Sequence, residues 1–159
     1  EITLGIVPGI GAMVVPYRRW PQAAATFHGM LRRADKLKAA EARKLGVVDA
    51  LADDLPGLIV TALARVQALA GKPSPIAQGA VPLAPLEPIT PASASGQPLS
   101  QEIMGILESA VRDAAAATTL DAALEIGYRA FGASACTAAA REGIGAFQEG
   151  RKPDFSRTS

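Results

Sequence analysis

The stretch Ser100-Gln-Glu-Ile-Met-Gly-Ile-Leu-Glu-Ser-Ala-Val-Arg-Asp-Ala-Ala-Ala-Ala117 decides the fold class of this chain. Ser100 suits a helix N-cap, because its hydroxyl can accept a hydrogen bond from a backbone N–H of the first turn. Apolar residues then recur at helical spacing along one face: Ile103, Ile106, Leu107, Ala110 and Val111. The sequence therefore predicts an amphipathic helix over about 100–117.

Similar patterns on both sides of this segment predict a mostly α fold. Alanine, the best helix former, accounts for 33 of the 159 residues. In 54–71, apolar residues recur at helical spacing at Ile59, Leu63, Val66 and Ala70. With the helix over 100–117, we expect about six helices, the other five at 22–33, 36–45, 54–71, from Thr119 or Asp121 to 131, and 135–149.

The N-terminal residues predict a short strand followed by a glycine-rich turn. Residues 1–7 are rich in β-branched residues, and Pro8-Gly9 then begins a turn that continues through Gly11 to Ala12. Gly9 and Gly11 permit two interpretations: part of a dinucleotide-binding loop, or a tight turn that needs positive φ. The turn is favoured, because Val14 stands where the third glycine of the dinucleotide pattern belongs.

A proline-rich segment separates the first helices from the last ones. Seven prolines fall between residues 73 and 98, where Glu87 is the only charged residue. Proline removes backbone donors at this density and excludes a helix or a central strand. We therefore expect three parts: 1–71, a connector over 72–99, and a C-terminal helical region over 100–159 of the kind that mediates oligomerisation.

Composition argues against several classes of function. Sixteen Lys and Arg against fifteen Asp and Glu give a net charge of +1, too weakly basic for a typical nucleic-acid binder. One Cys and one His exclude an internal disulfide and a Cys/His zinc site. The single Cys favours a reducing, cytoplasmic setting. No apolar run is long enough to span a bilayer, so we expect no membrane association. Position 1 is Glu rather than Met, and we expect the natural chain to begin earlier.

Three segments in order resemble signatures of the enoyl-CoA hydratase/isomerase (crotonase) superfamily. They are EITLGIVPGIG at 1–11, ADKLKAAEARKLGVVD at 34–49 and REGIGAFQEGRKPDF at 141–155. The resemblance implies the C-terminal part of a crotonase-like α/β fold, a ββα spiral. It also implies a parent enzyme that adds water across a 2-enoyl-CoA and assembles as a trimer or hexamer.

The resemblance also implies roles for individual residues. Glu1 matches the second of two acid/base glutamates, and Gly9 matches a glycine whose N–H positions the water. Phe147 matches an aromatic residue that lines the pocket for the CoA adenine. Arg151 or Lys152 would meet the CoA phosphates in place of a family lysine that is Gly150 here. The resemblance implies no metal, and no cofactor other than the coenzyme A of the substrate.

Alternatives remain open at this level. The chain could be a non-catalytic helical oligomerisation module, or its parent could catalyse isomerase, dehydratase or hydrolase chemistry. A terminal Glu1, taken alone, is more often a solvated chain end than a catalyst. His28 is expected on the surface or at an interface, and Arg18 and Arg19 are expected as exposed residues at the entry to a helix.

Overall fold

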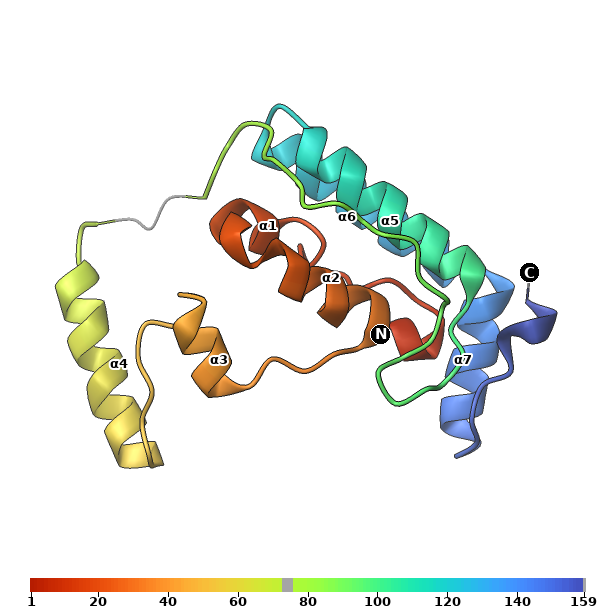
Figure 1. Cartoon of the computed structure of the whole chain (residues 1–159), viewed down its shortest axis with the longest axis horizontal. Coiled ribbons are helices and arrows are strands. Elements are labelled where there is room, and N and C mark those ends of the chain that lie inside the picture. The colour runs from red at the N-terminus through yellow and green to blue at the C-terminus, as the bar shows by residue number, and fades with distance from the viewer. Residues whose placement is uncertain (73–75, 159) are drawn as a thin grey trace. The chain divides into compact units, whose positions relative to one another are not determined.

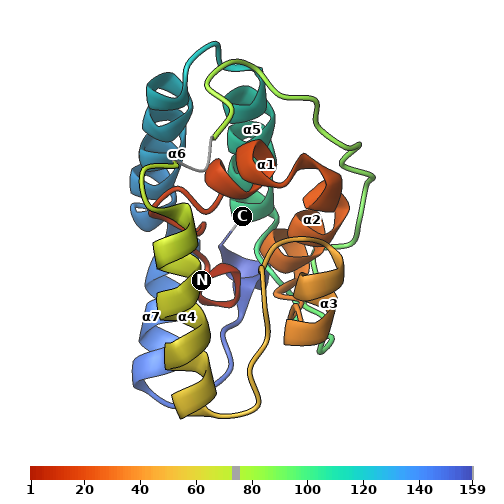
Figure 2. The same cartoon turned by 90° about the vertical axis from the view of Figure 1, so that its left-hand side faces the viewer.

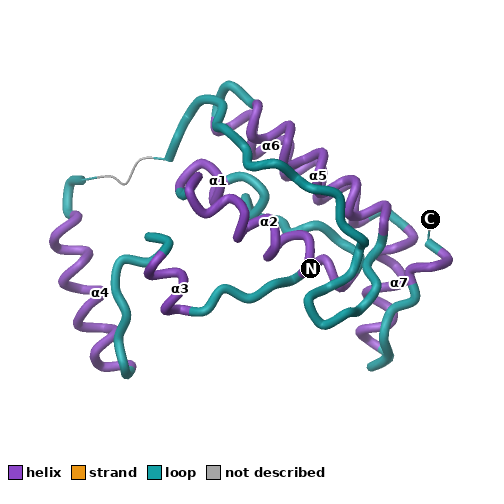
Figure 3. Tube along the Cα trace, in the orientation of Figure 1, coloured by secondary structure: helices purple, strands orange, loops and turns teal. Residues whose placement is uncertain are grey.

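The computed structural model describes residues 1–72 and 76–158 and is mostly helical, as predicted (Figure 3). The described residues form seven α-helices and three short 3-10 helices, and only an isolated bridge between Ala92 and Pro98 has β character. The α-helices are α1 (Val15–Arg19), α2 (Ala24–Arg33), α3 (Ala39–Lys44), α4 (Leu55–Leu69), α5 (Gln101–Ala116), α6 (Leu120–Ala135) and α7 (Ala138–Gln148). The 3-10 helices are η1 (Ile2–Leu4), η2 (Pro21–Ala23) and η3 (Phe155–Arg157).

The chain divides into two compact units. The first combines Glu1–Lys36 with Ala77–Ser159, and the second comprises Leu37–Ile76. The proline-rich segment thus belongs largely to the first unit, although Pro73 and Pro75 lie outside the described residues. None of the helices within the described ranges is long and apolar enough to cross a membrane.

α5 and α6 pack against each other as an antiparallel hairpin along one side of the first unit (Figures 1 and 2). The Ser100 hydroxyl accepts from the Ile103 N–H at 3.4 Å, so the predicted cap is confirmed. Thr119 caps α6 in the same way, through the Ala122 N–H at 3.1 Å. α5 buries most of its predicted face together with further residues: Ile103, Met104, Leu107, Ala110, Val111, Ala114 and Ala115.

The predicted N-terminal strand is wrong. Residues Ile2–Leu4 form the 3-10 helix η1, which ends at Gly5 in the left-handed conformation, with φ 68°. A strand needs a neighbouring strand to pair its backbone groups, and none exists among the described residues. Ile2 and Val7 are instead buried against helices, so the apolar pattern that suggested a strand reports burial.

A buried arginine holds the proline-rich segment against α5. Prolines supply no N–H donors, so the carbonyls of such a segment must find donors elsewhere. Arg18, which is 3% exposed, donates to carbonyls of the segment and of the C-terminal end of α5. The accepting residues are Ala77 at 3.0 Å, Gln78 at 3.0 Å, Gly79 at 2.5 Å, Ala114 at 2.8 Å and Ala117 at 3.0 Å. The prediction of an exposed Arg18 is therefore wrong.

Two residues of α2 hold the same segment further along the chain. His28 Nε2 lies 2.9 Å from the Ala84 carbonyl, and Arg32 Nη2 donates to the Glu87 carbonyl at 2.6 Å. Both side chains are 6% exposed, so of the two places expected for His28, the surface is excluded. The segment lies along α5 because side chains of α1 and α2 satisfy its carbonyls (Figure 1).

In the second unit, the helix predicted over 54–71 is present as α4, but it buries none of its residues. Asp54 caps it, accepting from the Gly57 N–H at 2.7 Å. Seven large apolar side chains are exposed: Leu55, Leu58, Ile59, Val60, Leu63, Val66 and Leu69. α4 is therefore a well-capped helix whose large apolar side chains are exposed among the described residues.

Candidate functional site

Glu1 is exposed and immediately precedes η1, which packs on α7. Two glycines allow this close packing. A Cβ added at Gly143 of α7 would collide with the Leu4 carbonyl, and one added at Gly5 would collide with the Ala139 carbonyl. Backbone therefore contacts backbone here, and the end of η1 at Leu4 and Gly5 is anchored to α7.

The chain then passes from α7 to α6 through a buried hydrogen bond. The Val7 N–H donates to the Ser134 hydroxyl of α6 at 3.2 Å, and both residues are fully buried. Ser134 in turn donates to the Phe131 carbonyl at 2.8 Å, which fixes the direction of its hydroxyl. The segment between Glu1 and the glycine turn is thus held rigidly on the last two long helices.

The glycine turn lies against α6 and carries unpaired donors. A Cβ at Gly9 would lie 3.2 Å from the Phe131 ring, and one at Gly11 would lie 3.3 Å from Leu124. Ala12 donates to the Gly9 carbonyl at 3.1 Å, and Val15 donates to the Gly11 carbonyl at 2.9 Å. Within the described part of the chain, the N–H groups of Gly9, Ile10 and Gly11 have no acceptor.

The backbone of the turn adopts a conformation that costs energy. Gly11 has φ 77°, and Ile10 has φ 54°, a value that β-branched residues strongly disfavour. The Ile10 side chain is 96% exposed, so packing of this side chain does not compensate for its unfavourable φ. Strained, exposed turns with free donors are frequent at functional sites.

The predicted CoA-binding residues differ in their availability. Phe147 lies on α7 and is 72% exposed. Arg151 is occupied: its guanidinium donates to both carboxylate oxygens of Glu142, at 2.5 and 3.0 Å, and to Glu149 at 2.5 Å. Lys152 is exposed and makes no ion pair within residues 1–72 and 76–158.

The ion pair of Arg151 fastens the C-terminal tail. Hydrogen bonds from Arg151 and from the Asp154 N–H lower the pKa of Glu142 to about 2. The same Glu142 contacts raise the pKa of Arg151. Phe155 follows as a 5% exposed side chain that packs near Gly5. Arg151 therefore positions the tail, and Lys152 is the predicted cation that stays available to an anionic ligand.

A second polar cluster escaped the sequence analysis altogether. The Tyr17 hydroxyl lies 2.8 Å from His28 Nδ1, and Arg32 pairs with Glu108 of α5 at 2.7 Å. Burial raises the pKa of Tyr17 and lowers that of His28. The one sequence feature that could have indicated this cluster was the number of carbonyls in the proline-rich segment that lack a local donor.

Comparison with known proteins identifies no relative, since no family model, curated protein or solved structure matches this chain.

Proposed function

We propose that this chain is the C-terminal part of an acyl-CoA-processing enzyme of the crotonase superfamily that adds water across a 2-enoyl-CoA double bond. The observation that best supports the proposal is the geometry of 1–12. Glu1, the predicted acid/base residue, and a turn with free N–H donors lie on one short segment. This segment is anchored to α6 and α7.

The chemistry needs a water held by a base, a proton donor for the α carbon, and donors aimed at the thioester oxygen. In the proposed mechanism, the exposed Glu1 carboxylate exchanges a proton with the water or the α carbon. The free Gly9 N–H helps to orient that water. The resemblance assigns the other glutamate and the thioester-oxygen donors to a part of the family pattern that precedes Glu1.

The C-terminal residues then contribute to CoA binding. The exposed Phe147 ring is suited to stack on adenine, and Lys152 is suited to pair with a phosphate. Arg151 acts indirectly, since it holds the tail through Glu142. We therefore assign Arg151 to positioning and Lys152 to charge recognition.

Hydration of crotonyl-CoA, followed as loss of enoyl absorbance, tests the proposal. We expect this 159-residue chain to be inactive, because each missing thioester-oxygen donor costs about 3 to 4 kcal/mol in the transition state. A longer chain that includes the preceding family pattern should be active, and Glu1→Gln should abolish that activity. Glu125→Gln, at an exposed position of α6, is the matched control. Inactivity of the longer chain, or full activity of Glu1→Gln, would exclude the assignment.

The exposed surface of α4 favours a second role, in association with another copy of this chain. A helix that is apolar all round is normally buried. The one charged residue of α4, Arg65, pairs with Asp49 at 3.0 Å, so charge repulsion between two copies is small. Small residues such as Ala64 and Ala68 permit close helix approach. Self-association would cover the apolar surface without requiring catalysis.

Sedimentation velocity over a range of concentrations tests this second role. The unmodified chain should self-associate, and Leu63→Glu should shift it towards monomer. Gln67→Glu adds the same charge to α4 at a polar position and should behave like the unmodified chain. A monomer at every concentration would contradict the role.

A further inference from the structure

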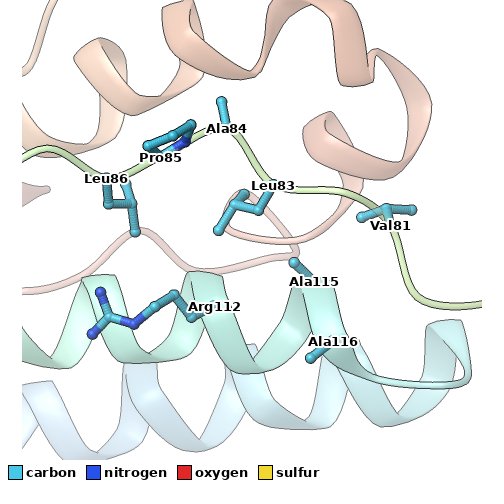
Figure 4. Close-up of a pocket in the computed structure, with 8 residues that line it drawn as sticks. All are labelled: Val81, Leu83, Ala84, Pro85, Leu86, Arg112, Ala115 and Ala116. Carbon is cyan, nitrogen blue, oxygen red and sulfur yellow. The ribbon is translucent and has the colours of Figure 1, made fainter.

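A groove of about 430 Å³ lies between the proline-rich segment and the C-terminal half of α5 (Figure 4). One wall consists of Val81, Leu83 and Leu86, and Figure 4 shows the two leucines directed towards α5. The other wall consists of Ala115 and Ala116 on α5, and Arg112 lies at one end near Leu86. Its volume falls within the usual range for small-molecule pockets.

The groove is formed before any ligand arrives. The segment that makes one wall is stiffened by its prolines and is held from behind by Arg18, His28 and Arg32, all of them buried. At the Ala115 end, the Val81 N–H donates to the Ala115 carbonyl at 2.9 Å. The backbone on both sides therefore has little entropy to lose when a ligand binds.

The charge at the other end of the groove is not balanced. Glu108 lies between two guanidinium groups, Arg32 at 2.7 Å and Arg112 at 3.9 Å. The carboxylate is thus committed to the buried Arg32, and among the described residues Arg112 has no other ion pair. Because one carboxylate faces two guanidinium groups, the Arg112 end carries excess positive charge.

The Ala115 end is apolar and carries little net charge. The C-terminus of a helix carries partial negative charge on its last carbonyls. Here the buried Arg18 guanidinium donates to the Ala114 and Ala117 carbonyls and offsets that charge. The groove thus runs from an apolar end at Val81 and Ala116 to a cationic end at Arg112.

We propose that this groove binds an amphiphilic carboxylate, with an aliphatic chain of medium length along Val81, Leu83 and Leu86 and the carboxylate on Arg112. A guanidinium binds a carboxylate through two parallel N–H donors, and the half-exposed Arg112 side chain can turn its donors towards the groove. The site does not depend on Glu1, Gly9 or the hydration reaction.

Titration calorimetry of this chain with decanoate below its micelle concentration tests the proposal. Decanol, with the same chain and no charge, should bind about threefold to fivefold more weakly, as expected for a solvent-exposed ion pair. Acetate, with the charge and no chain, should not bind measurably. Equal affinities for decanoate and decanol would overturn the assignment of the carboxylate to Arg112.

Three variants locate the ligand. Arg112→Gln should remove the preference for decanoate over decanol and keep decanol binding. Ala116→Leu places a larger side chain in the groove from an exposed position, so it should weaken both ligands while the circular dichroism spectrum stays unchanged. Val66→Glu on the exposed face of α4 should leave both affinities unchanged. Loss of binding in Val66→Glu alone would place the ligand on α4 and overturn the proposal.

Discussion

Ile10 is the residue whose backbone conformation fits its side chain least. Its φ of 54° brings the Cβ close to the following carbonyl oxygen, and the exposed side chain recovers no packing energy. Ile10→Gly should therefore raise the free energy of unfolding by about 1 kcal/mol. Gly11→Ala, at φ 77°, should lower it. Urea unfolding measures both, and a destabilised Ile10→Gly would contradict the strain argument.

His28 should make stability depend on pH. Its Nε2 must donate, because the Ala84 carbonyl can only accept, so the neutral ring accepts from Tyr17 at Nδ1. Burial is the main cause of its lowered pKa; Arg32 lowers the pKa further, while the Ala84 hydrogen bond and Glu108 raise it. The unfolded chain therefore binds a proton at a higher pH than the folded chain does.

The sign of the effect follows from this linkage. The contribution of His28 to stability is complete above the unfolded pKa of about 6.5 and declines as pH falls from there through the folded pKa. Urea unfolding at intervals between pH 7.5 and 5 should show this decline. Since His28 is the only histidine of the chain, His28→Gln should flatten it. An unchanged slope in the variant would assign the effect to other groups.

Two glycines of α7 offer a matched test of how this helix holds η1. A Cβ at Gly143 would meet the Leu4 backbone, whereas one at Gly145 would meet no atom within 4 Å. Gly145→Ala should stabilise the chain by up to about 1 kcal/mol, the helix-propensity difference. Gly143→Ala gains the same propensity but must displace η1, so it should be destabilising. Thermal unfolding compares them, and equal effects would contradict the packing of η1 on α7.

The proline-rich segment should lose its place on α5 when Arg18 is removed. Arg18→Met leaves five carbonyls without this donor, and we expect a loss of about 3 kcal/mol, because a hydrogen bond to a charged group is worth about 1.5 to 3 kcal/mol and several are lost together. Arg19→Met removes an exposed neighbour that lies over the Trp20 ring, and it should cost about 1 kcal/mol or less. Urea unfolding separates the two, and similar losses would contradict the central role of Arg18.

At the scale of the whole molecule, local signals predicted elements far better than they predicted contacts. The cap at Ser100 placed the start of α5 correctly, and Thr119, one of the two starts considered for the next helix, caps α6, because a cap is a hydrogen bond between residues three apart. α6 extends to Ala135, beyond the predicted end at 131, and continues through Gly132, because a single glycine weakens a helix without necessarily ending it. α1 was not expected as a separate helix, although Pro16 suits a first turn.

In the candidate site, too, local motifs predicted some features and the tertiary structure supplied the others. Glu1, Gly9 and Phe147 could be chosen from their motifs, and the structure adds the free N–H groups of the turn and the exposure of the ring. It also separates Arg151 from Lys152, a distinction that depends on where the Glu142 carboxylate lies. The groove at Arg112 has no motif, because its walls come from segments about 30 residues apart.

Sequence alone determined the helical class, the approximate positions of the helices and the glycine turn, since each depends on interactions within a few residues of chain. Only the tertiary structure decided that Ile2–Leu4 is helical, that Arg18 and His28 are buried, and that α4 buries none of its apolar side chains. In each of these cases the outcome depends on whether residues far along the chain pack against the segment. A backbone carbonyl that needs a donor from 60 residues away leaves no periodic pattern near either residue.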